Sequence, residues 1–454
     1  TARSNFKHPI IITLLLFVLV QIISALFGMD PFQSFFGKTL HMEGVIFWIH
    51  VLLFFFYLQL LFQIEPKSKI FILRFFLVIA GFTGLIAFLQ KGSILPLPYE
   101  SFQERVTATF SNPIYFASSL VIPFFLSLGL IPIHKSAWDR RFKIVIIILC
   151  FLGLLSAGTR GAAVGVIAGL ITWLFLWIRS KHIQKQSWRK PIQYGMLFFV
   201  ITILIVFLSH IQTNSNLSLS RFKNFTPDYA RFAYWTMSLQ GWKESPWFGV
   251  GPQNFEYIAY HHYTPALYKN IGFAWPYRPH NQLLEILATM GLFAFILYLL
   301  FHIFLLKKTL SSVSSDMGIQ KEAVCSAIVA YFVQNLFIYD TEAPLVGFIF
   351  LAAYIFSMQQ HQKPVIAHQK KYIPILFVSL FLIPIYLWSH YLFPTFTFYT
   401  HIKQAHILNK DQPQKALDQL SFIDQYTFVF DRVLLADTYA KILIPEGINQ
   451  SNLA

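Results

Sequence analysis

The sequence predicts an all-α fold, a polytopic transmembrane helix bundle with about eleven spans. Hydrophobic residues make up 56% of the 454 residues and charged residues only 12%, whereas a soluble domain carries about 25% charge. Phe occurs 50 times, which suits contact with lipid. A helix needs about 20 apolar residues to cross the hydrocarbon core, and apolar runs of this length recur along the chain.

These apolar runs divide the chain into a membrane domain, 1–393, and a hydrophilic tail, 394–454. A second long hydrophilic segment, the loop 210–280, interrupts the membrane domain. The expected spans lie at 9–28, 45–63, 70–89, 113–133, 143–157, 160–178, 192–209, 281–305, 323–339, 343–358 and 372–393.

Basic residues in the connections set the orientation, because Lys and Arg are enriched on the cytoplasmic side of a membrane. The short outer connections hold only Lys38, Lys91, Arg105 and Arg160 if the N-terminus is cytoplasmic. The loop 210–280 and the tail then lie outside the cytoplasm. The basic residues of the inner segments are Arg3, Lys7, Lys67, Lys69, Lys135, Arg140, Arg141, Lys143, Arg179, Lys181, Lys185, Arg189, Lys190, Lys307, Lys308, Lys321, Lys363, Lys370 and Lys371.

The tail is predicted to form three amphipathic helices, at about 400–409, 412–425 and 428–442. Small and apolar residues recur in it as in a tetratricopeptide helical hairpin, and such a tail would hold a protein partner. A helical tail that packs on the membrane domain is the alternative. The chain starts at Thr1 and stops inside a helical pattern, so we expect a fragment truncated at one or both ends.

Several functional classes are excluded by what the sequence lacks. Much of the net charge of +15 follows from topology, and no nucleic-acid motif accompanies it. There is no Walker-type phosphate loop, which argues against ATP-driven transport. The two cysteines fall inside apolar runs, and no cluster of ligands has metal-binding spacing. We therefore expect no metal, no cofactor and no nucleic-acid partner.

Arg160 is the first candidate site residue, because ionisable groups at membrane depth are costly and default to a functional hypothesis. It follows Ser156-Ala157-Gly158-Thr159, a tight outer turn between two spans. The planar guanidinium suits phosphate. The alternative is an interfacial arginine that reaches lipid headgroups.

His280 is the candidate general base. It follows Tyr277-Arg278-Pro279 and precedes Asn281, a good N-cap for the next span. The histidine would then lie just outside a helix N-terminus, where backbone N–H groups favour anions. A histidine can accept a proton at neutral pH, although an interfacial histidine with no catalytic role is the alternative.

The loop holds a third candidate in Arg231, on a predicted short amphipathic helix at 229–235 that lies on the outer face. Its aromatic neighbours would equally suit an interfacial anchor. The glycine-rich turn 246–251 follows, and its glycines permit close approach of another backbone.

Together these segments resemble the O-antigen ligase and polymerase family of bacterial membrane proteins. The resemblance covers roughly 100–360, and each motif lies on the predicted outer face. The matching stretches are Thr109 to Pro113, Ser156 to Gly165, Arg231 to Trp235, Pro246 to Gly251, His280 to Glu285, and Gly291-Leu292.

The resemblance implies an inverting glycosyltransferase that moves a glycan from undecaprenyl diphosphate to an acceptor at the outer face of the bacterial inner membrane. Arg160 and Arg231 would bind the carrier diphosphate, and His280 would deprotonate the acceptor hydroxyl. Arg278 would assist. Three residues around His280 complete the expected substrate-binding set: Tyr277, Asn281 and Glu285.

The sequence leaves the acceptor open between a lipid A core sugar, the growing glycan and a protein serine or threonine. A transporter of lipid-linked glycan would use the same arginines, but should show charged or broken helices at mid-membrane and internal repeats, and neither is evident. A membrane scaffold that presents its tail is a third reading. Two departures from the family are the eleven spans, where twelve are common, and Gly158-Thr159, where many members have a second serine.

Overall fold

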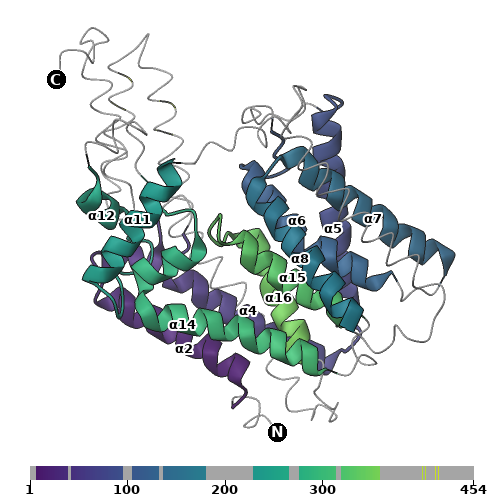
Figure 1. Cartoon of the computed structure of the whole chain (residues 1–454), viewed down its shortest axis with the longest axis horizontal. Helices are drawn as coiled ribbons and strands as arrows, with labels where there is room; N and C mark the ends of the chain where they lie inside the picture. The colour runs from purple at the N-terminus through teal and green to yellow at the C-terminus, as the bar shows by residue number, and fades with distance from the viewer. Residues whose placement is uncertain are drawn as a thin grey trace. The chain divides into compact units, whose positions relative to one another are not determined.

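The computed structural model describes residues 7–38, 42–95, 105–131, 136–179, 229–264, 276–312 and 319–357 (Figure 1). Within these ranges the regular elements are α-helices. In the tail it describes only His401, Gln404, Lys415 and Asp418, each helical. The expected spans 192–209 and 372–393, the tetratricopeptide-like hairpin and much of the loop 210–280 lie outside the described residues.

Most expected spans in the described ranges appear as helices close to their predicted positions. The helices are α2 (Pro9–Leu26), α3 (Pro31–Phe36), α4 (Val45–Ile64), α5 (Ser68–Lys91), α6 (Pro113–Leu130), α7 (Ala137–Ala157), α8 (Arg160–Arg179), α11 (Tyr229–Glu244), α12 (Phe255–His262), α14 (Gln282–Ser311), α15 (Lys321–Gln334) and α16 (Glu342–Ser357).

Six of the described helices are long and apolar enough to cross a membrane: α2, α4, α5, α6, α8 and α14. The chain is therefore a multi-pass membrane protein, as its composition predicts. The count of about eleven spans and the orientation of the ends stay predictions. The chain forms two compact units, and apart from the last residue of α3 these helices belong to the first, Thr1–Phe35 with Gly44–Ile366.

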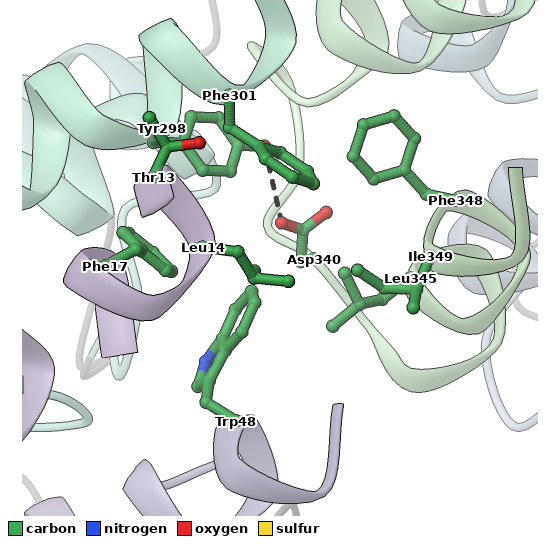
Figure 2. A pocket seen from close by; sticks show the side chains of 10 residues that line it. All are labelled: Thr13, Leu14, Phe17, Trp48, Tyr298, Phe301, Asp340, Leu345, Phe348 and Ile349. Carbon is green, nitrogen blue, oxygen red and sulfur yellow. Dashed lines mark hydrogen bonds between the residues drawn. The ribbon is translucent and has the colours of Figure 1, made fainter. Parts of the chain in front are cut away.

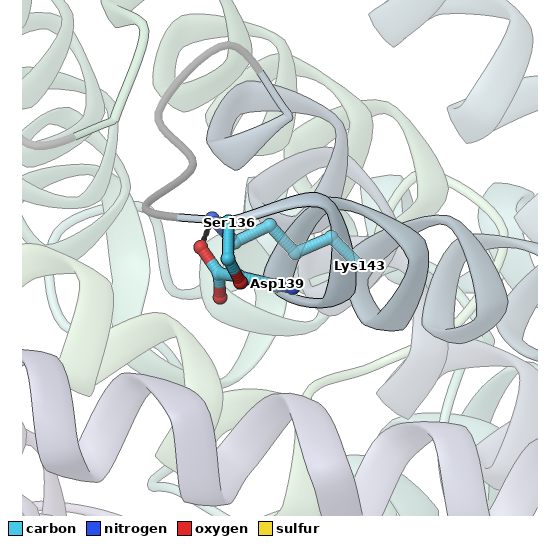
Figure 3. A network of polar contacts seen from close by, with 3 residues as sticks. All are labelled: Ser136, Asp139 and Lys143. Carbon is cyan, nitrogen blue, oxygen red and sulfur yellow. Dashed lines mark hydrogen bonds and ion pairs between the residues drawn. The ribbon is translucent and has the colours of Figure 1, made fainter.

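Helix α7 begins six residues before the predicted span 143–157, because polar side chains support its first turns (Figure 3). Ser136 is the N-cap, and its Oγ accepts a hydrogen bond from the backbone N–H of Asp139 at 3.2 Å. The Asp139 carboxylate pairs with Lys143 Nζ, one turn on, at 2.8 Å. The basic residues from Arg140 to Lys143, assigned to a loop from the sequence, thus lie on the helix itself.

Small residues bring helices α8 and α15 into close contact. A Cβ on Gly165 would lie 2.6 Å from the Ala330 carbonyl oxygen, and one on Gly169 would lie 2.9 Å from the Ala330 Cβ. Such close backbone approach is typical of helix pairs in membranes. Helix α15 also packs on α6, and α14 packs on α2.

Helix α14 is broken at Gly291, which has φ +80° and ψ −176°. The predicted turn 246–251 lies against the break. Its backbone replaces the lost helical bonds: Gly251 N–H donates to the Thr289 carbonyl at 2.8 Å, and Leu292 N–H donates to the Pro246 carbonyl at 2.9 Å. No broken helix was evident from the sequence, because the break is completed by a segment some 40 residues upstream.

Candidate functional site

His280 stands directly before α14 in a backbone conformation that is rare for residues other than glycine, with φ +54°. Asn281 is the N-cap, and its Oδ1 accepts hydrogen bonds from the N–H groups of Leu283 and Leu284 at 3.0 and 3.1 Å. The predicted cap is confirmed. A left-handed, non-glycine backbone costs about 1–3 kcal/mol and is found preferentially at functional sites.

Aromatic rings surround the half-buried His280. The ring centroids of Tyr339, Tyr234 and Tyr277 lie 5.6, 6.4 and 6.5 Å from the centroid of its imidazole. Tyr234 comes from α11, and its neighbour Trp235 donates its Nε1–H to the Pro279 carbonyl at 3.1 Å. Helix α11 is thereby fixed to the backbone beside the histidine.

Tyr339 comes from the non-helical connection between α15 and α16, residues 335–341, and is 1% exposed. Its hydroxyl shares hydrogen bonds with the hydroxyls of Tyr115, at 2.5 Å, and Tyr277, at 2.7 Å. Tyr115 lies in the first turn of α6. The connection 335–341 therefore joins the start of α6 to the segment that carries His280.

Arg278 lies over the face of Tyr339, with its guanidinium carbon 4.4 Å from the ring centroid. One guanidinium nitrogen donates to Gln253 Oε1 at 2.9 Å, and the residue is 4% exposed. A guanidinium on an aromatic face is a stabilising cation–π contact. Arg278 thus holds the segment 276–280 against the connection 335–341.

The turn that carries Arg160 is built as predicted, between the end of α7 and the start of α8. Gly158 closes α7 with φ +56°, and Arg160 is the first, half-buried residue of α8. Arg105 braces this turn: its Nε donates to the Ala157 carbonyl at 2.9 Å and a terminal nitrogen to Thr159 Oγ1 at 2.7 Å. Thr159 supplies the hydroxyl that accepts this second bond.

The Arg160 turn and the start of α14 meet the same connection 335–341. A Cβ on Gly161 would lie 2.9 Å from the Phe337 Cβ. From the other side, the Gln282 N–H donates to the carbonyls of Asn335 and Ile338 at 2.8 and 3.0 Å. Thr159 Oγ1 also donates to the Pro113 carbonyl at 3.3 Å. The N-terminal ends of α6, α8 and α14 therefore converge around this connection.

The remaining predicted residues lie nearby. Arg231 is half-buried on α11, one turn before Trp235. That helix extends to Glu244, well beyond the predicted 229–235, because the apolar residues Tyr234 and Met237 bury its inner face. Glu285 is 3% exposed, in the first turn of α14, where a negative charge complements the helix dipole. Substrate contacts of Tyr277, Asn281 and Glu285 stay predictions.

Asp340 is the acidic residue among the side chains that line a largely apolar cavity (Figure 2). Its carboxylate accepts hydrogen bonds from Tyr331, from Asn335 Nδ2 at 2.5 Å and from Tyr298 at 3.4 Å. Its backbone N–H donates to Gln282 Oε1 at 2.8 Å. The cavity is lined by Thr13, Leu14, Phe17, Trp48, Tyr298, Phe301, Asp340, Leu345, Phe348 and Ile349.

Sequence reasoning missed Arg105, Tyr115, Tyr339 and Asp340. The one available signal was the placement of Asp340 between the predicted spans 323–339 and 343–358, where an ionisable group is costly. Among the residues that the structure describes, no group of three or more His, Cys, Asp or Glu side chains could hold a metal ion. The metal-independent reaction stays a prediction.

Comparison with known proteins matches residues 145–299 to the O-antigen ligase family. This segment includes Arg160, Arg231 and His280. The chain is also 23% identical over 302 residues to the teichuronic acid biosynthesis protein TuaE of Bacillus subtilis, a match that spans 63% of this chain and 59% of the relative. Residues 145–299 of this multi-pass membrane protein therefore match the O-antigen ligase family, which confirms the family resemblance indicated by the motifs.

Proposed function

We propose that the protein is a metal-independent, inverting glycosyltransferase that moves a glycan from undecaprenyl diphosphate to an acceptor hydroxyl at the outer face of the bacterial inner membrane. The observation that carries this proposal is the meeting of His280, Arg278 and the Arg160 turn around the connection 335–341. The family match over 145–299 supports it.

His280 is the proposed general base. The acceptor oxygen attacks the anomeric carbon as its proton passes to the imidazole, and the bond from that carbon to the diphosphate breaks. The leaving group is already anionic, so it needs charge stabilisation rather than protonation. General base catalysis typically contributes about 10²–10⁴-fold to the rate.

Arg160 and Arg231 are proposed to hold the diphosphate. Guanidinium groups bind phosphate oxygens through two parallel N–H donors, and fixed positive charge lowers the barrier where negative charge develops. The converging N-termini of α6, α8 and α14 add positive ends of helix dipoles to the same region. The similarity to a teichuronic acid biosynthesis protein favours the growing glycan as acceptor over a lipid A core sugar or a protein side chain.

The test reconstitutes the purified chain in vesicles with an undecaprenyl diphosphate-linked glycan. Glycan, lipid A core and peptide acceptors are supplied in separate reactions, with and without EDTA. Release of undecaprenyl diphosphate and the glycosylated acceptor are measured. Wild type should release the carrier with EDTA present, and His280→Ala should reduce the rate by about 10²-fold or more.

The matched control is His261→Ala, which removes an exposed histidine of the same loop region and should keep the wild-type rate. Equal rates for His280→Ala and wild type would show that His280 is not the general base. The break in α14 at Gly291 supports a second candidate, a lipid-linked glycan transporter, because transporters use discontinuous helices. Movement of intact donor between leaflets without carrier release would favour that candidate.

A further inference from the structure

Tyr339 lies at the point where three separate parts of the site meet. Its ring faces the Arg278 guanidinium at 4.4 Å and packs beside the His280 imidazole at 5.6 Å between centroids. Its hydroxyl bonds both Tyr115 and Tyr277. One side chain thus links the proposed base, the buried arginine beside it and the first turn of α6.

The backbone on either side of Tyr339 is fixed as well. Next to it, Asp340 accepts side-chain hydrogen bonds from α14 and α15 and bonds Gln282 through its backbone. On the other side, the Ile338 carbonyl accepts from the Gln282 N–H at 3.0 Å. The backbone that carries the Tyr339 ring is therefore held in place by hydrogen bonds on both sides, as a positioning group requires.

The Tyr339 hydroxyl is neutral at physiological pH. Burial, together with the nearby hydroxyls of Tyr115 and Tyr277, raises the pKa of Tyr339 far above its ordinary value. The ring therefore offers Arg278 a π-face and no phenolate charge that would compete with an anionic ligand. A tyrosine at this position also does not act as the base.

We propose that Tyr339 is a positioning residue of the transfer reaction, which holds Arg278 and His280 in register with the start of α6. This inference rests on the proposed function, because it assigns Tyr339 a role in binding the carrier diphosphate and in the use of His280. The ring orients Arg278 and His280 by contact, and the hydroxyl fixes the ring through Tyr115 and Tyr277.

Two variants, Tyr339→Phe and Tyr339→Leu, distinguish the contribution of the ring from that of the hydroxyl. Tyr339→Phe keeps the face under Arg278 and loses both hydroxyl contacts, so kcat should fall about fivefold while the KM for the lipid-linked donor stays near wild type. Tyr339→Leu loses both contacts and the ring. Its kcat should fall by about tenfold or more, and its KM for the donor should rise, because small displacements of reacting groups carry large rate losses.

The matched control is Tyr354→Phe, the same chemical change at a buried tyrosine near the far end of α16. It should keep kcat and KM. Thermal unfolding in detergent is followed for each variant, because a merely structural role would lower the Tm without the split between KM and kcat. If Tyr339→Leu does not fold, Tyr339→Phe tests the proposal alone: a lower kcat at wild-type KM supports it, and a wild-type kcat contradicts it.

A binding measurement keeps this inference separate from the proposed function. Undecaprenyl diphosphate itself is titrated against each variant in detergent. Weaker binding by Tyr339→Leu than by Tyr339→Phe supports the role of the ring even if wild type transfers no glycan, a result that would overturn only the proposed function. Wild-type binding, kcat and KM in both Tyr339 variants would overturn the inference.

Discussion

The Trp247 carbonyl oxygen lies so close to Gly291 that it leaves no room for a side chain on that residue. A Cβ built on Gly291 would fall 2.2 Å from that oxygen and 2.4 Å from the Phe248 nitrogen. The turn 246–251 can therefore enter the break in α14 only because residue 291 has no side chain. Ser24 of α2 closes the contact, since its Oγ donates to the Phe248 carbonyl at 2.5 Å.

Gly291→Ala should therefore destabilise the protein. The new methyl group would meet backbone atoms that cannot move aside, and φ +80° is unfavourable for alanine. We expect a loss of about 3 kcal/mol or more in the free energy of unfolding, read as a lower Tm in detergent. Gly92→Ala is the control, because its nearest contact would be 3.5 Å from a flexible Ile94 side chain. Equal Tm values for the two variants would contradict the tight contact.

Asp340 should make stability depend on pH. Burial raises the pKa of Asp340 to about 6 from 3.8, although Tyr331, Asn335 and Tyr298 donate hydrogen bonds to its carboxylate. A folded-state pKa above the unfolded value means that the folded state binds the proton more tightly. Its contribution to stability is full below pH 3.8 and is lost as the pH rises through about 6.

Asp340→Asn removes this titration. The Tm of wild type should fall more steeply between pH 4 and pH 6.5 than the Tm of the variant, a difference on the order of 1–3 kcal/mol in unfolding free energy. The comparison uses the slope, because asparagine also loses part of the hydrogen bonding and lowers the Tm at every pH. Parallel curves would show that Asp340 does not titrate in this range.

The Arg105 brace should matter for catalysis through Arg160. Thr159→Val keeps the shape of residue 159 and removes the hydroxyl that accepts from Arg105 and donates to the Pro113 carbonyl. Because Arg160 follows directly, we expect kcat/KM for the lipid-linked donor to fall by about tenfold. Thr159→Ser keeps the hydroxyl and should behave as wild type. A serine variant as poor as the valine variant would point to packing instead of the hydrogen bonds.

Trp235 should support His280 through the backbone. Trp235→Phe removes the Nε1–H that donates to the Pro279 carbonyl and keeps an aromatic ring on α11. We expect kcat to fall about fivefold with little change in Tm, because a single hydrogen bond contributes about 1 kcal/mol. Trp242→Phe on the same helix loses a similar bond to the Pro246 carbonyl, away from His280. It should change the Tm as little as Trp235→Phe does and leave kcat unchanged, and an equal fall in kcat in both variants would contradict the role of Trp235.

Local sequence determined the features that depend on a few neighbouring residues. Asn112 and Asn281 cap α6 and α14 because an Asx side chain before a helix satisfies free backbone N–H groups. Gly158 allows the left-handed turn before Arg160. Helix ends were less predictable: α15 ends at Gln334, five residues before the predicted end of its span, since residues 335–341 bond α14 instead of continuing the helix.

By itself, the sequence determined that the chain spans a membrane many times, since composition and apolar runs need no partner to be read. It also singled out Arg160, Arg231 and His280 as candidates by their motifs, and their roles stay predictions. Only the tertiary structure brought Tyr339 to Tyr277, 62 residues away, and to Tyr115, 224 residues away, and seated the turn 246–251 at Gly291. Those contacts depend on how separate helices pack, and packing between distant segments leaves no periodicity in either segment that would reveal the pair.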